Sequence, residues 1–91
     1  MTTIELEVFL RDTGIELRTL ERWVERAWIA PAHEGPGLAL TEADAARCCF
    51  IRDLQADFGV NEEGVDVVLH FVDQLHGLRR ALLALRGRSG D

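Results

Sequence analysis

Apolar residues recur at helical spacing in four stretches of this 91-residue chain, which predicts a largely helical fold. The first helix is expected to begin with a capping box formed by Thr2 and Glu5. It should stop at Gly14, because glycine accepts the left-handed conformation that ends many helices. A second helix is expected over residues 17–26, with Trp23 at the flank of its apolar face. The residues predicted to form that face are Leu17, Leu20, Val24 and Ala27.

A turn-rich patch follows the second helix. Two prolines and two glycines interrupt the helical periodicity between residues 30 and 38. Short extended pieces flank this patch at Trp28–Ala30 and Leu38–Leu40. Their pairing would form a small β-hairpin.

Two further helices are predicted in the second half of the chain. Thr41 and Asp44 have the spacing of a capping box and open a third helix, which should end at Gly59. The predicted buried stripe of this helix is Ala46, Cys49, Phe50 and Leu54. Asn61 is a favourable N-cap for a fourth helix, whose apolar pattern runs to Leu85 at near-heptad spacing.

The length of the fourth helix predicts an oligomer. A helix of roughly 25 residues, at about 1.5 Å per residue, is about 37 Å long. That exceeds the width of a core built by three short helices, so part of the apolar stripe must contact a second chain. We therefore expect a homodimer through this helix, with residues 1–86 as a single domain and 87–91 as a disordered tail. The predicted dimerisation residues are Val68, Val72, Leu75, Leu78 and Leu82.

Charge and composition narrow the class of protein. The chain has 16 carboxylates and ten basic residues, all of them arginine, for a net charge of −6. This balance argues against a generic nucleic-acid binder, which needs surplus positive charge to neutralise phosphates. No apolar run reaches the roughly 18 residues that a spanning helix needs, and the N-terminus lacks a signal-peptide pattern. We therefore expect a cytoplasmic protein.

Residues that could support catalysis or bind a metal are sparse. Cys48 and Cys49 are adjacent, which favours two reduced cysteines on a helix, one facing the core, over a disulfide framework. Asp66, His70 and Asp73 share one helical face, but a tight metal site would need further ligands from elsewhere. We expect no enzymatic activity, no metal and no cofactor.

Three arginines on the second predicted helix raise the possibility of DNA binding. Arg18, Arg22 and Arg26 recur every four residues, and they would face phosphates if the first two helices form a helix-turn-helix. However, Glu21 and Glu25 are interleaved at positions suited to pairing with them. The segment from 32 to 40 also contains no arginine with which to hold a DNA backbone. A solvated, self-paired helix face is the alternative.

Acidic residues gather in a later segment. No arginine lies between Asp53 and Asp73, so this acidic corner should carry a negative potential. Its residues are Asp53, Asp57, Glu62, Glu63, Asp66 and Asp73. Beside Phe58 or Val60 they could dock a basic helix, or they could serve solubility alone.

The order of these elements resembles the MerR-like winged helix-turn-helix. The resemblance is carried by FLRDTGIELRTLERWVERAWIAP and by the segment that begins LTEADAARCCF. The segment DFGVNEEGVDVVLHFVDQLHGLRRAL resembles the CbpM family of chaperone modulators, in which a glycine-valine pair opens a long apolar-repeat helix. Together these matches extend from about Ile4 to Leu85.

The resemblance implies a mostly all-α fold with a long C-terminal helix and a minimal β-hairpin wing. It also implies a modulator that binds the J-domain of a CbpA-type DnaJ-like co-chaperone and blocks its stimulation of DnaK. Such a protein would be cytoplasmic, or nucleoid-associated through its partner. The alternative is a MerR-type DNA-binding transcriptional regulator that uses Arg18, Arg22 and Arg26. Such regulators usually carry arginine and tyrosine in the second helix and arginines in the wing, whereas this chain has Trp23 and an arginine-free 32–40 segment.

Overall fold

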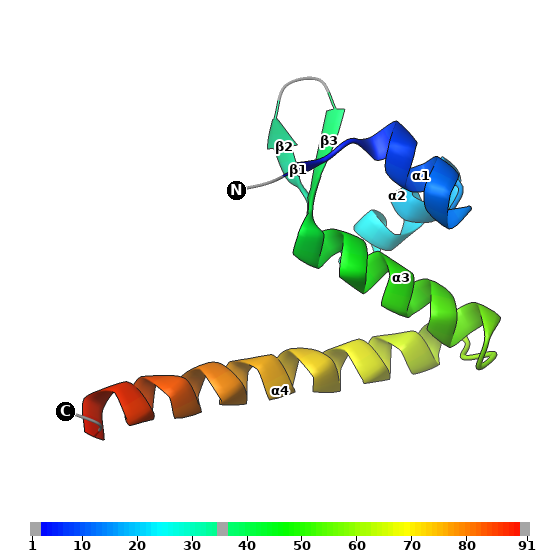
Figure 1. Ribbon diagram of the computed structural model, residues 1–91. Coiled ribbons are helices and arrows are strands. Elements are labelled where there is room, and N and C mark those ends of the chain that lie inside the picture. The colour runs from blue at the N-terminus through cyan, green and yellow to red at the C-terminus, as the bar shows by residue number, and fades with distance from the viewer. Residues whose placement is uncertain (1–2, 35–36, 90–91) are drawn as a thin grey trace. The chain divides into compact units, whose positions relative to one another are not determined.

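Four helices and three short strands make up the described part of the chain, residues 3–34 and 37–89 of a computed structural model (Figure 1). In chain order they are β1 (Thr3–Ile4), α1 (Leu6–Thr13), α2 (Leu17–Glu25), β2 (Ala32–Glu34), β3 (Gly37–Thr41), α3 (Glu42–Ala56) and α4 (Glu62–Ser89). The chain divides into two compact units, Met1–Val60 and Asn61–Asp91, which we call the first and second units. No described helix has the length and apolar character needed to cross a membrane.

The turn between α1 and α2 follows the predicted helix end. Gly14 adopts a φ of 76°, and its N–H donates to the Leu10 carbonyl over 3.0 Å. The Thr13 hydroxyl donates to the Phe9 carbonyl (2.8 Å) and accepts the N–H of Ile15 (3.2 Å). These local bonds satisfy backbone groups that the helix end leaves open, so the chain can reverse direction within a few residues.

The start of α1 differs from the prediction. Thr2 lies outside the described residues, and Glu5 is the N-cap without a side-chain capping bond. The two residues before it form β1, in which Thr3 pairs with Thr41 and Ile4 with Leu40. A two-residue strand is too short to show an alternating pattern, so sequence periodicity could not reveal it.

The buried face of α2 is rotated from the predicted one. Leu20 and Trp23 are buried, whereas Leu17 is 47% exposed. The large Trp23 side chain offers the most apolar area, so its burial moves the core-facing side toward it. Ala27, assigned to the same face by the sequence pattern, lies beyond the end of the helix and is exposed.

A Schellman motif ends α2. The Ala27 N–H donates to the Val24 carbonyl over 3.0 Å, and the Trp28 N–H donates to the Trp23 carbonyl over 2.9 Å. Ala27 has a φ of 60°, the conformation that glycine usually supplies at this position. The motif directs Trp28 and Ile29 into the core, where both are buried.

The three strands form one antiparallel sheet in the order β1-β3-β2. The hairpin of β2 and β3 pairs Ala32 with Ala39 and Glu34 with Gly37. The hairpin is confirmed, but its first strand lies at Ala32–Glu34 and not at Trp28–Ala30, because the core takes up the side chains of Trp28 and Ile29. The central strand β3 also contacts α1 and α3.

The α3 helix begins at the predicted capping box. The Asp44 N–H donates to Thr41 Oγ1 (3.1 Å), and the Thr41 N–H donates to Asp44 Oδ2 (3.0 Å). The predicted buried stripe is wrong: the residues of α3 that are buried are Cys48 and Ile51, and Ala46 and Phe50 are exposed. Cys49 and Leu54 are half-buried. The helix α3 packs against β3, whose Leu40 is buried, and Cys48 and Ile51 are its core-facing residues.

The second unit is the helix α4. The side-chain Oδ1 of Asn61 accepts the N–H of Gly64 over 2.8 Å, as expected for an N-cap. Val65 and Leu69 are buried, whereas every side chain from Asp73 to Gly87 except Gly77 is exposed. The helix continues to Ser89 where a disordered tail was expected from residue 87, because each added residue extends the existing hydrogen-bond ladder. Residues 90 and 91 lie outside the described part.

Candidate interaction surfaces

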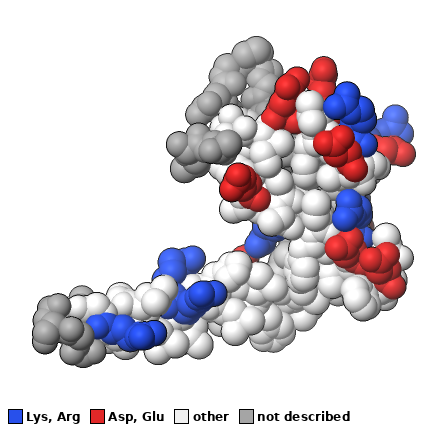
Figure 2. Space-filling model, viewed as in Figure 1, with Lys and Arg blue, Asp and Glu red and all other residues white. Residues whose placement is uncertain are grey.

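The exposed side of α2 carries both positively and negatively charged side chains. Arg18 and Arg22 are exposed, as are the interleaved Glu21 and Glu25. On the side of the first unit that Figure 2 shows, arginines and carboxylates are mixed and form no continuous basic patch. The expected charge interleaving on α2 is therefore present, and it leaves little net positive potential for a phosphate backbone.

The three arginines of the predicted DNA-reading face are not equivalent. Arg26 caps the C-terminus of α2 and is half-buried. Its guanidinium carbon lies 4.9 Å from the centroid of the Trp28 ring, within the range of a cation–π interaction. Arg26 therefore covers a core tryptophan, and the structure does not present it alongside Arg18 and Arg22.

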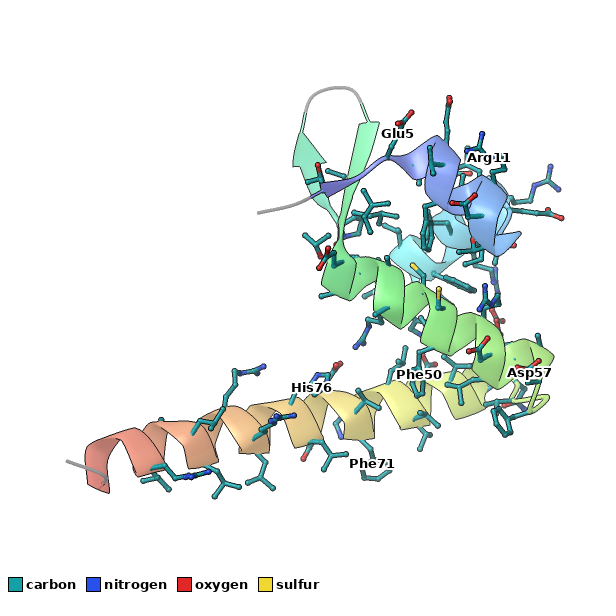
Figure 3. All side chains as sticks on the ribbon, viewed as in Figure 1. Glu5, Arg11, Phe50, Asp57, Phe71 and His76 are labelled. Carbon is teal, nitrogen blue, oxygen red and sulfur yellow. The ribbon has the colours of Figure 1, made fainter. Side chains whose placement is uncertain are left out.

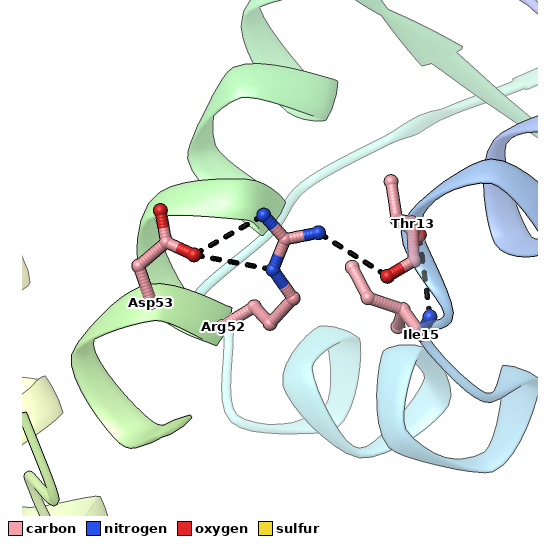
Figure 4. A network of polar contacts seen from close by, with 4 residues as sticks. All are labelled: Thr13, Ile15, Arg52 and Asp53. Atoms are coloured by element: carbon pink, nitrogen blue, oxygen red, sulfur yellow. Dashed lines mark hydrogen bonds and ion pairs between the residues drawn. The ribbon is translucent and has the colours of Figure 1, made fainter. Parts of the chain in front are cut away.

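Arg52 joins α3 to the turn between α1 and α2 (Figure 4). Its Nη1 donates to the Thr13 carbonyl over 3.2 Å. Its Nε and Nη2 both donate to Asp53 Oδ1, over 3.2 and 3.1 Å. Asp53, one of the predicted partner-binding residues, is thus compensated by the arginine just before it, which lies outside the arginine-free segment from Asp53 to Asp73.

A shallow hollow lies beside this arginine in the first unit. Its lining includes Glu16, Thr19, Trp23, Arg52 and Gln55. The Arg52 guanidinium is already bonded to Thr13 and Asp53. The contacts of Arg52 therefore stabilise the helix-turn-helix.

The predicted acidic corner is spread over two elements. Asp53 lies on α3 and Asp57 is its exposed C-cap, labelled in Figure 3. The other four carboxylates lie on α4, where Glu63, Asp66 and Asp73 are exposed and Glu62 is half-buried. Phe58, directly after Asp57, is 75% exposed, which provides an apolar side chain next to acid.

The apolar stripe predicted for dimerisation divides into two groups. Leu75, Leu78 and Leu82 are 64%, 60% and 53% exposed, whereas Val68 and Val72 are half-buried. Phe71, labelled in Figure 3, is 62% exposed and follows the same helical spacing as the leucines. We call Phe71, Leu75, Leu78 and Leu82 the apolar face of α4. Phe71 was missed by the sequence analysis, although its spacing of four and seven from Leu75 and Leu78 was a usable signal.

The cysteine and histidine residues that could support catalysis or bind a metal do not form a reactive site within the described residues. Burial raises the pKa of the Cys48 thiol to about 12, with smaller contributions from Cys49 and Asp44, so this thiol stays protonated at neutral pH. His70 lies edge-on to Phe71, with ring centroids 5.7 Å apart. Within residues 3–34 and 37–89, no group of three His, Cys, Asp or Glu residues is placed to hold a metal ion.

The arrangement of the first unit defines its class. Two helices joined by a short turn, a β-hairpin and a capped third helix make a winged helix-turn-helix. Residues 4–87 match the family model described as MerR HTH family regulatory protein, and the chain therefore belongs to this family of regulators. Its fold is the MerR-like helix-turn-helix with a minimal wing and a long C-terminal helix. Comparison with curated proteins and with solved structures gave no match.

Proposed function

We propose that this MerR-family regulator acts by binding a basic protein surface and has no enzymatic activity of its own. The charge of the helix-turn-helix unit is the observation that carries the proposal. Residues 1–60 contain eleven carboxylates and six arginines, for a net charge of −5. A unit of this charge is repelled by nucleic-acid phosphates, so we look for the partner among proteins, and the arginine-free acidic segment of α4 is the local site proposed for a basic surface.

The partner we propose is the J-domain of a CbpA-type DnaJ-like co-chaperone, met in the cytoplasm. The proposal rests on the resemblance of the Asp57–Leu78 segment to CbpM. J-domains carry a basic helix that engages the Hsp70, so a modulator bound there would block stimulation of DnaK. The carboxylates of the acidic corner that lie on α4, namely Glu62, Glu63, Asp66 and Asp73, supply complementary charge for such a helix.

Charge reversal tests this site. We expect the triple variant Glu62→Arg, Glu63→Arg and Asp66→Arg to bind a purified J-domain at least tenfold more weakly than the wild type. Single exposed pairs contribute about 0–1 kcal/mol each, so three reversals together are needed for an effect of that size. Isothermal titration at low and moderate salt would measure it.

A matched control reverses three exposed carboxylates of the first unit, the N-cap Glu5 together with Glu7 and Asp12 of α1. This variant changes the net charge by the same amount and should bind close to wild type. Equal weakening in both variants would indicate general charge attraction and contradict the site. A wild-type chain that does not bind any J-domain would contradict the partner.

We also propose that the protein is a homodimer through α4. The exposed apolar face of α4 supports this, because its three leucines and its phenylalanine are each more than half exposed. Sedimentation equilibrium at tens of micromolar should give the mass of two chains.

The second candidate function is transcriptional regulation. Membership of the MerR HTH family favours it, as do the exposed Arg18 and Arg22 on α2. The net charge of −5 on the first unit opposes it.

A further inference from the structure

The hollow beside Arg52 in the first unit has a volume of about 390 Å³ and plays no part in the function proposed above. It lies between the turn that joins α1 to α2, the α2 helix itself and the C-terminal end of α3. Its lining residues are Gly14, Ile15, Glu16, Thr19, Trp23, Arg52, Gln55 and Ala56. Ligand sites in proteins have volumes of about 300–1,000 Å³, so this hollow suits a single long side chain better than a large cofactor.

Apolar side chains form the base of the hollow. Trp23 and Ile15 are only 3% and 6% exposed, so they border the hollow from the core side. Ala56, the last residue of α3, is exposed at the edge of the hollow. An aliphatic chain that enters the hollow therefore loses contact with water and gains contact with the indole ring.

The polar side chains of the hollow favour a hydrogen-bond donor. Glu16 is exposed and is the N-cap of α2, where its side chain makes no capping bond. Thr19 and Gln55 are half-buried, and each has an oxygen that can accept a hydrogen bond. Arg52 also lines the hollow, but its Nη2 lies 3.1 Å from Asp53 Oδ1, which compensates its charge (Figure 4). The remaining charge is the Glu16 carboxylate.

We propose that this hollow binds a lysine or arginine side chain of a protein partner. The aliphatic stem of that side chain covers Ile15 and Trp23, and its charged end donates to Glu16 and Gln55. The net charge of −5 on the first unit favours a cationic occupant over an anionic one. The inference adds a site to the segment of α4 described above, and it rests on the proposed protein-binding function only for the protein that carries the side chain.

Blocked tripeptides test the site on the intact chain. Their central residue is lysine, arginine or norleucine between two glycines, and norleucine is the matched control because it keeps the aliphatic stem without the charge. In a proton–nitrogen NMR titration, we expect the lysine and arginine peptides to shift the Trp23 indole N–H, the Gln55 side-chain amide and the Thr19 N–H saturably. One side chain supplies little binding free energy, so we expect a dissociation constant of about 1–10 mM. The norleucine peptide should bind at least tenfold more weakly.

Two variants separate the charge of the hollow from its shape. Glu16→Gln should weaken binding of the lysine peptide about two- to fivefold, which is the scale of one exposed ion pair. Ala56→Leu places a larger side chain at the edge of the hollow and should weaken binding at least tenfold by exclusion. The matched control is Ala46→Leu, because Ala46 is exposed on α3 and does not line the hollow. It should bind as wild type does.

The outcomes separate the inference from the proposed function. Unchanged signals with both basic peptides at about 20 mM would overturn the inference, as would equal binding of the norleucine peptide or wild-type affinity in Ala56→Leu. A wild type that binds the lysine peptide in the hollow but binds no J-domain would retain the inference and overturn the proposed partner. A wild type that binds a J-domain but neither basic peptide would retain the proposed function and overturn the inference.

Discussion

Ala27 illustrates how a single residue can hold an unfavourable conformation. It occupies the left-handed position of the Schellman motif after α2, with a φ of 60°. A side chain costs about 1–2 kcal/mol in this conformation, and glycine avoids most of that cost. The burial of Trp28 and Ile29 immediately afterwards stabilises the strained turn.

Replacement of this alanine should stabilise the protein. We expect Ala27→Gly to raise the free energy of unfolding by about 0.5–1 kcal/mol, since relief of strain exceeds the added entropy of the unfolded chain. Ala46→Gly is the control, because Ala46 is exposed within α3, and the same change there should destabilise by about 1 kcal/mol. Urea unfolding measures both. Destabilisation by Ala27→Gly would contradict the strained turn.

Because of Cys48, we expect the free energy of unfolding to decrease at alkaline pH. Its thiol keeps its proton to about pH 12 in the folded chain, against an ordinary pKa of 9.0. Because the folded-state pKa is raised, the stabilisation is complete below pH 9 and is lost as the pH rises toward 12. The chain contains no lysine and no tyrosine, so the groups that usually obscure this range are absent from its sequence.

A pair of variants isolates this thiol. We expect Cys49→Ser to lose stability above pH 9 with a slope approaching about 1.4 kcal/mol per pH unit. Adding Cys48→Ala should lower stability at pH 7 by opening a small cavity but should remove most of that slope. Urea unfolding at pH 7, 9 and 10.5 would show this. If the free energy of unfolding fell with pH equally in the single and the double variant, burial of a protonated thiol at position 48 would be ruled out.

At the level of elements, local sequence motifs determine where the helices end, whereas tertiary packing determines which side of each helix is buried. The capping box of Thr41 and Asp44, the left-handed Gly14 and the N-cap Asn61 all lie where the sequence predicts them. The buried sides of α2 and α3 do not lie where the sequence predicts them. They are determined by tertiary packing, which buries Trp23 and Trp28 and places α3 against β3. A local motif can therefore place the end of a helix without indicating which side is buried.

The exposed face of α4 leads to a prediction for this element. We expect Leu75→Gln with Leu78→Gln to yield a folded monomer, because both side chains are exposed within the single chain and would be buried only by a second copy. The control Ala81→Gln with Ala84→Gln places the same polar groups on the other side of the helix. Light scattering over a range of concentrations measures the mass of each variant, which should be that of one chain for the leucine variant and of two chains for the alanine control. A dimer that survives the leucine changes would place the interface elsewhere.

At the level of the whole molecule, the distribution of charge is more informative than its total. The net charge of −6 comes mainly from the first unit, at −5, whereas the second unit combines five carboxylates with four arginines. The second unit is nearly neutral, but it is strongly polar along α4. The acidic helix-turn-helix argues for a basic protein partner rather than for nucleic acid.

The charge of the first unit predicts the outcome of a DNA-binding test. We expect no retardation of duplex DNA at micromolar protein and low salt, because the negative unit gains no counterion-release free energy from phosphates. The variant Arg18→Glu with Arg22→Glu should behave identically. Retardation with a steep salt dependence in the wild type, lost in that variant, would establish transcriptional regulation in place of the function we propose.

The contacts that connect distant segments were beyond prediction from sequence. Arg52 reaches the Thr13 carbonyl across 39 positions, and the short strand β1 pairs with β3, which lies beyond both α1 and α2 in the chain. Arg26, predicted to face phosphates, covers the Trp28 ring. None of these partners is encoded by spacing, since each depends on where the folded chain places a second segment.

The amino-acid sequence by itself determined the number of helices, most of their ends, the hairpin and the separation of charge along α4. These features depend on groups within about four residues of one another, or on composition alone. Only the tertiary structure decided which side of each helix is buried, which arginines are held in contacts and which apolar residues of α4 stay exposed. Those properties depend on how all side chains pack into a single core. In that core Trp23 and Trp28 are buried, whereas Leu17, which the apolar pattern assigns to the buried face, is exposed.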